Sequence, residues 1–196
     1  MDNLLIFSAN ETTHTKRTKR VLEWMEELKL HLQLAKCKFN TREVDYLGMI
    51  VQKEETTMDP IKLGGIIKWP IPTTIKETCS FLGFTNFYQQ FISNYSTVAR
   101  PLINLTKKNS QWTWKEFQQK TFEHLKTLFL SKPVHQFPDF SKPFAIAINA
   151  SLHATKGILL QTNTNGDWHS CFYLSQLFSP AKQNYDVYNQ ELLVAL

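Results

Sequence analysis

The spacing of apolar residues in the first third of the chain predicts a strand, a helix and a hairpin. Residues 3–8 form a short apolar run, which predicts a buried strand. After a possible cap at Thr12 or Thr13, apolar residues recur at helical spacing at Val21, Met25, Leu28 and Leu32. Alternation from residue 39 to residue 51 predicts a hairpin, with residues 44–51 as one arm.

Prolines and capping residues divide the middle of the chain into helices. Pro60 can begin a helix that runs to about Lys68, because proline suits a first helical turn. Thr73 or Thr74, followed by Glu77, has the pattern of a capping box and predicts a helix that continues towards residue 92. Further helices are expected over residues 101–105 and 116–130, followed by an irregular, proline-containing crossing.

The pattern changes to strands near residue 144. Strands are expected over residues 144–148, 156–161 and 168–174, and a helix over residues 185–196. The predicted fold class is therefore α+β. Three strands and one helix bury little surface, so we expect this last module to be incomplete.

The positive charge of the chain is concentrated in its middle. The formal net charge is +5, yet residues 141–196 carry three lysines against three acids. Against a single acid, Glu77, residues 60–110 hold six cations: Lys62, Lys68, Lys76, Arg100, Lys107 and Lys108. A basic segment with interleaved aromatics suits a nucleic-acid backbone, although a solvated face without a partner is the alternative.

Cysteine, histidine and hydropathy patterns argue against several classes of protein. The three cysteines are far apart, which fits reduced, partly buried thiols better than a disulfide framework. The six histidines lack metal-ligand spacing and are expected on the surface or in linkers. No membrane-spanning run or secretory leader is evident, so a cytoplasmic or nuclear, non-secreted location is expected.

Short motifs follow one another in a specific order along the whole chain. They are Lys36-Cys37-Lys38-Phe39, Tyr46-Leu47-Gly48, Ile67-Lys68-Trp69-Pro70, Phe81-Leu82-Gly83, Asn86-Phe87-Tyr88, Arg100-Pro101-Leu102, Trp112-Thr113-Trp114, Asn149-Ala150-Ser151 and Glu191-Leu192-Leu193. The ordered set resembles the Pol polyprotein of gypsy-type LTR retrotransposons, in a partial and degenerate copy. The resemblance implies the end of a reverse-transcriptase palm (1–58), a helical thumb (59–110), a connection (111–141) and a truncated ribonuclease H-like domain (142–196).

The family's polymerase motif, Tyr-x-Asp-Asp, aligns with the start of this chain. Asp2 matches its first acid, but Asn3 replaces the second. Two Mg²⁺ ions held by clustered carboxylates support nucleotide transfer in the family, and an amide is a poor Mg²⁺ ligand. Asp2 is therefore expected to be a remnant, or simply a solvated acid. Met1 lies inside the motif, which suggests translation or a gene model that starts within a longer frame.

The ribonuclease H motif is altered in the same way. Asn149 replaces the first metal-binding acid, whereas Glu191 matches the second and has a solvated helix carboxylate as its plain alternative. The remaining acids would lie beyond Leu196. We therefore expect Mg²⁺, the family's cofactor, not to bind stably.

The resemblance also implies a grip on the template and primer. Tyr46, Leu47 and Gly48 would lie in the hairpin that positions the primer end, unless they form an ordinary hairpin with Tyr46 packed inside. Gly83 and Phe87 share one face of the thumb helix, where glycine would permit close approach of a sugar edge or of another helix. Phe81, Phe84, Tyr88 and Phe91 are more simply core residues.

These observations predict a reverse transcriptase and ribonuclease H segment that is inactive alone and binds duplex or hybrid nucleic acid without sequence preference. The family's activities are RNA-directed DNA polymerase and RNA–DNA hybrid ribonuclease. One alternative is part of an active enzyme, complemented by a missing amino-terminal fingers and palm segment. The other is a domesticated protein-interaction scaffold.

Overall fold

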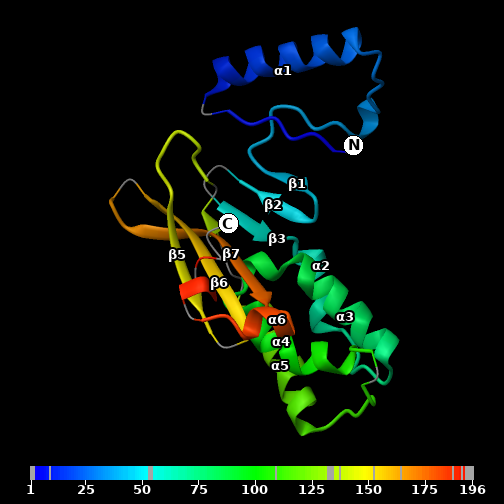
Figure 1. The fold of residues 1–196 in the computed structure, drawn as a ribbon. Coiled ribbons are helices and arrows are strands. Elements are labelled where there is room, and N and C mark those ends of the chain that lie inside the picture. Colours follow the sequence, from blue (N-terminus) through cyan, green and yellow to red (C-terminus); the bar gives the residue numbers. More distant parts are fainter. Residues whose placement is uncertain are drawn as a thin grey trace.

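The computed structural model describes residues 3–8, 10–52, 55–108, 110–131, 135–136, 138–151, 153–163, 165–186, 188–190 and 192. Its helices are α1 (Glu11–Glu27), α2 (Pro60–Ile67), α3 (Ile75–Phe87), α4 (Tyr95–Leu105), α5 (Glu116–Leu130) and α6 (Pro180–Gln183). Its strands are β1 (Val44–Tyr46), β2 (Met49–Val51), β3 (Glu55–Met58), β4 (His135–Gln136), β5 (Ala145–Ala150), β6 (Ala154–Thr162) and β7 (Trp168–Leu177). Short 3₁₀ helices cover Leu34–Lys36 and Gln89–Phe91. The α+β fold class is confirmed (Figure 1).

The strands form two antiparallel sheets. The first has the order β1-β2-β3-β4, so β4 joins it from far along the chain. The second has the order β5-β6-β7, with a register shift between Leu159 and Leu160. The three strands predicted near the end of the chain are therefore confirmed, and each is longer than its pattern indicated.

Several predicted elements are wrong. Residues 3–8 form no strand, and the apolar run is only partly covered: Leu4 is 60% exposed, whereas Leu5 and Ile6 are half-buried. Residues 44–51 are two short strands around a turn at Leu47 and Gly48, because both residues have positive φ. The irregular crossing contains β4, and α4 begins at Tyr95, six residues before Pro101.

The helix predictions fare better in the middle of the chain. The α2 and α5 helices have nearly the predicted bounds, and α3 ends at Phe87 instead of continuing to residue 92. Half of the residues in the helix predicted for 185–196 lie outside the described residues; of the others, 188–190 and 192 are helical and 185–186 are not. No helix in the described part of the chain is both long and apolar enough for a bilayer span.

One aromatic core joins α2, α3, α4 and α5. Phe81 and Phe122 are fully buried, with ring centroids 4.6 Å apart, and Trp69 meets the edge of Phe81 at 5.7 Å. Burial of a large apolar side chain contributes about 1.5–3 kcal/mol, so these rings anchor the helices. Phe81, Tyr88 and Phe91 are confirmed as core residues and Phe84 packs against them, whereas α1 contributes no buried residue and lies apart from this core (Figure 1).

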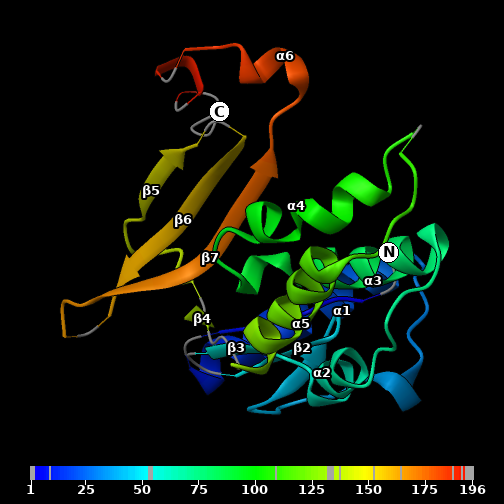
Figure 2. The same cartoon turned by 90° about the horizontal axis from the view of Figure 1, so that it is seen from below.

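The second sheet is attached to the helical core along β7. The Ser96 hydroxyl at the start of α4 donates to the Ser175 carbonyl at 2.7 Å, and the Ser175 hydroxyl accepts from the Ser96 amide at 3.1 Å. Figure 2 shows α4 beside β7, with β5 at the outer edge of the sheet. The attachment therefore leaves β5 far from the helices.

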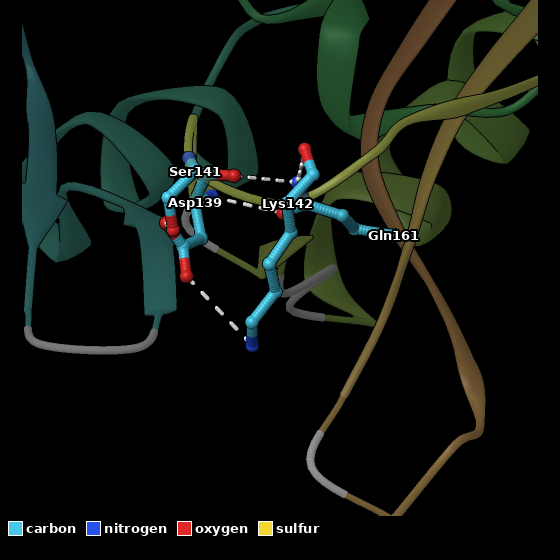
Figure 3. Close-up of polar contacts among 4 residues, drawn as sticks. All are labelled: Asp139, Ser141, Lys142 and Gln161. Atoms are coloured by element: carbon cyan, nitrogen blue, oxygen red, sulfur yellow. Dashed lines mark hydrogen bonds and ion pairs between the residues drawn. The ribbon is translucent and has the colours of Figure 1, made fainter.

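A buried glutamine holds the segment that leads into β5. Gln161 is fully buried; its amide group donates to the carbonyl oxygens of Asp139 (2.7 Å) and Lys142 (3.3 Å), and its carbonyl oxygen accepts from the Asp139 amide at 2.8 Å. The Asp139 carboxylate accepts two hydrogen bonds from Ser141 and lies 3.7 Å from the Lys142 ammonium (Figure 3). These Ser141 bonds, helped by Lys142, hold the pKa of Asp139 below its usual value. Gln161 thus fixes the approach to the sheet through the backbone.

Candidate nucleic-acid interface

The turn between β1 and β2 is tight and exposed at its tip. Leu47 and Gly48 both have positive φ (52° and 74°), the combination of a type I′ hairpin turn. The Tyr88 hydroxyl donates to the Gly48 carbonyl at 3.3 Å, and the Asp59 amide donates to the same oxygen at 3.2 Å. Burial raises the pKa of Tyr88, so its hydroxyl stays protonated as a donor. The turn is therefore fixed to α3 while Leu47 remains 48% exposed.

Local capping determines where α3 begins. The Thr74 hydroxyl accepts from the Glu77 amide at 3.2 Å, and the Glu77 carboxylate accepts from the amide (2.7 Å) and hydroxyl (2.9 Å) of Thr73. These hydrogen bonds, the Thr73 amide first, lower the pKa of Glu77. The predicted capping box is present in this modified form, and it uses the only acid of the basic segment as a cap.

One face of α3 is open along its length. Cys79, Gly83 and Phe87 are all exposed, Phe87 by 55%. A Cβ atom added at Gly83 would meet nothing within 4 Å. Within the described part of the chain, no other helix packs closely on Gly83, the alternative given by the sequence. The glycine leaves a bare stretch of helix surface, accessible to a partner.

The hairpin turn and the open face of α3 lie next to each other. A Cβ atom at Gly48 would lie 4.0 Å from Cε1 of Phe87, and the Phe87 ring meets Tyr88 edge-on at 4.8 Å. Beyond Gly83, a shallow groove of about 290 Å³ lies between α3 and α4. The structure thus brings Leu47 and Gly48 of the hairpin close to Gly83 and Phe87 of α3, although at least 35 residues separate the two pairs in the sequence. We call this surface the turn–helix surface.

Tyr46 is not part of the exposed tip. It is half-buried at the end of β1 and pairs with Met49 across the hairpin. The Gln90 amide lies 2.9 Å from the Met49 sulfur on the same hairpin. Half-burial of Tyr46 is closer to the ordinary hairpin that the sequence left open than to an exposed contact residue.

The six cations of the basic segment are distributed over three helices and a loop. Arg100 in α4 is half-buried, and the other five cations are exposed. Of these five, Lys62 lies in α2, Lys68 at its end and Lys76 in α3, while Lys107 and Lys108 follow α4. None of these cations makes an ion pair with a described residue. They are available to phosphates and come from several separate elements.

His135 is a structural residue that the sequence placed on the surface or in a linker. It is 3% exposed, stacks on Phe91 at 5.0 Å and meets the edge of Tyr173 at 5.0 Å. Its ring nitrogens face the carbonyl oxygens of Gln90 (Nε2, 2.5 Å) and Ser170 (Nδ1, 3.3 Å). Burial lowers the pKa of His135, and this effect outweighs the hydrogen bonds to the Gln90 and Ser170 carbonyl oxygens, which raise it. The only sequence signal was the apolar residue Val134 directly before it in the crossing.

The two acid-to-amide positions lie on separate parts of the molecule. Asn3 is exposed in the irregular first segment, and Asn149 is exposed on the edge strand β5, whereas Asp2 and Glu191 lie outside the described residues. In the described ranges, no three His, Cys, Asp or Glu side chains are grouped so that they could hold a metal ion. Neutral amides at both positions do not fit Mg²⁺, which prefers carboxylate oxygens.

The thiols differ from one another in exposure. All three cysteines are free; Cys171 is buried, Cys37 is half-buried and Cys79 is exposed on α3. Burial raises the pKa of the Cys171 thiol. Partial burial, as expected, holds for Cys37 and Cys171, while Cys79 is more accessible than expected.

Two family models match the sequence, one at each end of the chain. Residues 1–51 match reverse transcriptase (RNA-dependent DNA polymerase), and residues 114–196 match the RNase H-like domain found in reverse transcriptase. The retrovirus-related Pol polyprotein from transposon 297 of Drosophila melanogaster is 35% identical over 194 residues, 98% of this chain and 18% of that polyprotein. The transposon Tf2-7 polyprotein of Schizosaccharomyces pombe is 32% identical over 196 residues, 100% of this chain and 15% of the polyprotein.

The chain belongs to the reverse transcriptase and ribonuclease H-like region of LTR-retrotransposon Pol polyproteins. This Pol segment spans less than a fifth of the length of the curated relatives it matches. Reverse transcriptases and ribonucleases H generally use divalent metal ions.

The fold of this Pol segment is also similar to that of a retroviral enzyme. The foamy viral protease-reverse transcriptase in complex with double-stranded DNA matches with a TM-score of 0.74 and 22% identity, over 96% of this chain and 33% of that chain. The same enzyme in complex with an RNA/DNA hybrid matches with a TM-score of 0.74 and 21% identity, over 96% of this chain and 26% of that chain. At this identity the likeness concerns the fold.

Proposed function

We propose that this Pol segment binds double-stranded or hybrid nucleic acid through the turn–helix surface and performs neither nucleotide transfer nor hydrolysis by itself. The observation that carries the proposal is the open face at Gly83, next to the exposed Leu47–Gly48 turn and the Phe87 ring. Backbone without a side chain lets a sugar edge approach the helix closely, and the adjacent aromatic ring offers a flat contact.

Charge supports this assignment. The cations of the basic segment are not neutralised by described acids, and the single acid among them caps α3. Each phosphate neutralised by a lysine releases condensed counterions, which favours binding independently of sequence. The similar foamy viral enzyme forms complexes with double-stranded DNA and with an RNA/DNA hybrid.

The proposed lack of nucleotide transfer and hydrolysis rests on the side chains at the two metal positions of the family. Asn3 and Asn149 carry no charge and are both exposed to water. Bridging two divalent ions requires anionic ligands that offset the cost of removing water from the ions. An amide oxygen supplies a dipole only, so the pair of ions would not assemble at either position.

A substitution at Gly83 separates binding from stability. Gly83→Ala should stabilise α3 by up to about 1 kcal/mol, because glycine is a poor helix former and the added methyl group meets open space. The same variant, and more strongly Gly83→Leu, should weaken binding of a fluorescent RNA–DNA hybrid in anisotropy titrations. Gly64→Ala and Gly65→Ala in α2 are matched controls, since their added Cβ atoms also meet nothing within 4 Å.

The controls should gain stability in urea unfolding without a change in affinity. If Gly83→Leu binds the hybrid as tightly as the unmodified chain while the chain itself binds, the turn–helix surface is not the binding site. If the unmodified chain binds neither hybrid nor duplex at any salt concentration, the proposed function is wrong.

A further inference from the structure

Asn149 faces a lysine across the edge of the second sheet. The register of β5 and β6 places Asn149 directly opposite Lys156, and Lys156 in turn lies opposite Ser175 of β7. Directly opposed residues of an antiparallel pair point to the same face, with Cβ atoms about 4.5–5.5 Å apart. Ser175 is bonded to Ser96, so this face is the one that carries α4 (Figure 2). The amide and the ammonium are therefore neighbours on the helical side of the sheet.

Both side chains lack a partner among the described residues. Neither the Asn149 amide nor the Lys156 ammonium makes a hydrogen bond or ion pair with the part of the chain that the structure describes. Among the described residues from β5 to β7, the only carboxylate is that of Asp167. It lies in the β6–β7 turn, where the Asp167 backbone amide donates to the Asn163 side chain. Lys156 precedes that turn by six residues along β6, about 20 Å of strand.

A cation at this place is incompatible with a metal site. The family places a metal-binding acid where Asn149 stands, and Lys156 sets a positive charge within side-chain reach of that position. Asn149 deprives a divalent ion of its anionic ligand at this position. The positive charge of Lys156 would in addition repel the ion. The Lys156 ammonium and the Asn149 NH₂ group are hydrogen-bond donors, and the Asn149 amide oxygen is the one acceptor of the pair.

We propose that Lys156 and Asn149 form a metal-free contact for a phosphodiester group of the bound nucleic acid. The Lys156 ammonium supplies the positive charge and the Asn149 amide donates a further hydrogen bond to a phosphate oxygen. The inference rests on the proposed binding function and extends it to the second sheet. α4 links the two surfaces, since it packs against α3 and bonds to β7.

The salt dependence of duplex binding tests this contact. For a DNA duplex, each neutralised phosphate contributes about −0.9 to the slope of log K against log salt. Lys156→Gln should therefore make the slope shallower by about 0.9 and weaken binding, and Lys156→Arg should restore both. Lys120→Ala is the matched control, because the Lys120 ammonium is exposed and already lies 2.7 Å from Glu116; its slope should equal that of the unmodified chain.

The variant Asn149→Asp tests the exclusion of metal. A restored carboxylate should pair with Lys156 across the strands, so that duplex binding weakens and Mg²⁺ fails to bind in calorimetric titrations without nucleic acid. Thermal melting of each variant establishes that the sheet is folded. The inference is overturned if Lys156→Gln keeps the original slope while the unmodified chain binds duplex, or if Asn149→Asp binds Mg²⁺ with Lys156 in place. Failure of the unmodified chain to bind duplex would instead overturn the proposed function.

Discussion

Gly48 is the position where a single methyl group should be most harmful to the hairpin. Its φ of +74° lies in the left-handed region, and an added Cβ atom would stand 2.6 Å from the Tyr88 hydroxyl oxygen. A side chain in that backbone conformation costs about 1–2 kcal/mol. Displacing the Tyr88 hydroxyl loses a hydrogen bond worth about 0.5–1.5 kcal/mol. We therefore expect Gly48→Ala to lower the free energy of unfolding by about 1.5–3.5 kcal/mol.

A matched glycine separates the two contributions. Gly166 has a similar φ of +88°, but an added Cβ atom there would meet nothing within 4 Å. In urea unfolding, Gly166→Ala should lose only the backbone part, about 1–2 kcal/mol. In a Tyr88→Phe background, Gly48→Ala should become about as mild as Gly166→Ala, because the clashing oxygen is absent. Equal losses at Gly48 and Gly166 in the original background, or an undiminished loss with Phe at 88, would refute this reasoning.

Three further predictions concern the joints between elements. Gln161→Leu should lower the free energy of unfolding by about 2–3 kcal/mol, because the backbone groups of Asp139 and Lys142 lose their hydrogen-bond partner. Urea unfolding measures this loss, and an unchanged stability would contradict the prediction. Ser96→Ala should cost about 1–3 kcal/mol and increase amide hydrogen exchange in β7, with the exposed Ser93→Ala as control. The lowered pKa of His135 makes its neutral form the folded one, so its share of stability is present above the unfolded-state pKa of about 6.5 and is lost as the pH falls below that value. His135→Gln should flatten the loss of stability on acidification, and an unchanged pH profile would count against this role.

The sequence was most informative where short-range chemistry determines structure. Pro60 with the Asp59 cap begins α2, and Thr74 with Glu77 begins α3, because these residues satisfy the first amides of a helix locally. The three strands of the second sheet lie close to their predicted positions. The juxtaposition of Gly48 with Phe87 could be anticipated only through the family resemblance, which assigned hairpin and thumb helix to one grip.

Long-range pairing explains the features that the sequence did not predict. β4 is two residues long, too short for a pattern, and exists because Thr56 and Glu55 pair with it. The burial of His135 depends on Phe91 and Tyr173, which come from different parts of the chain. Likewise, a lysine opposite Asn149 has no meaning in the sequence until the register of β5 and β6 brings the two side chains together.

The most direct test of the account is a salt titration of RNA–DNA hybrid binding by the purified, unmodified chain, with a chelator present in place of Mg²⁺. The account predicts that the hybrid binds without divalent ions and that log K falls linearly with log salt, as expected for contacts to the phosphate backbone. Binding that requires Mg²⁺, or an affinity that does not change with salt, would contradict the claim that this Pol segment holds nucleic acid through metal-free backbone contacts.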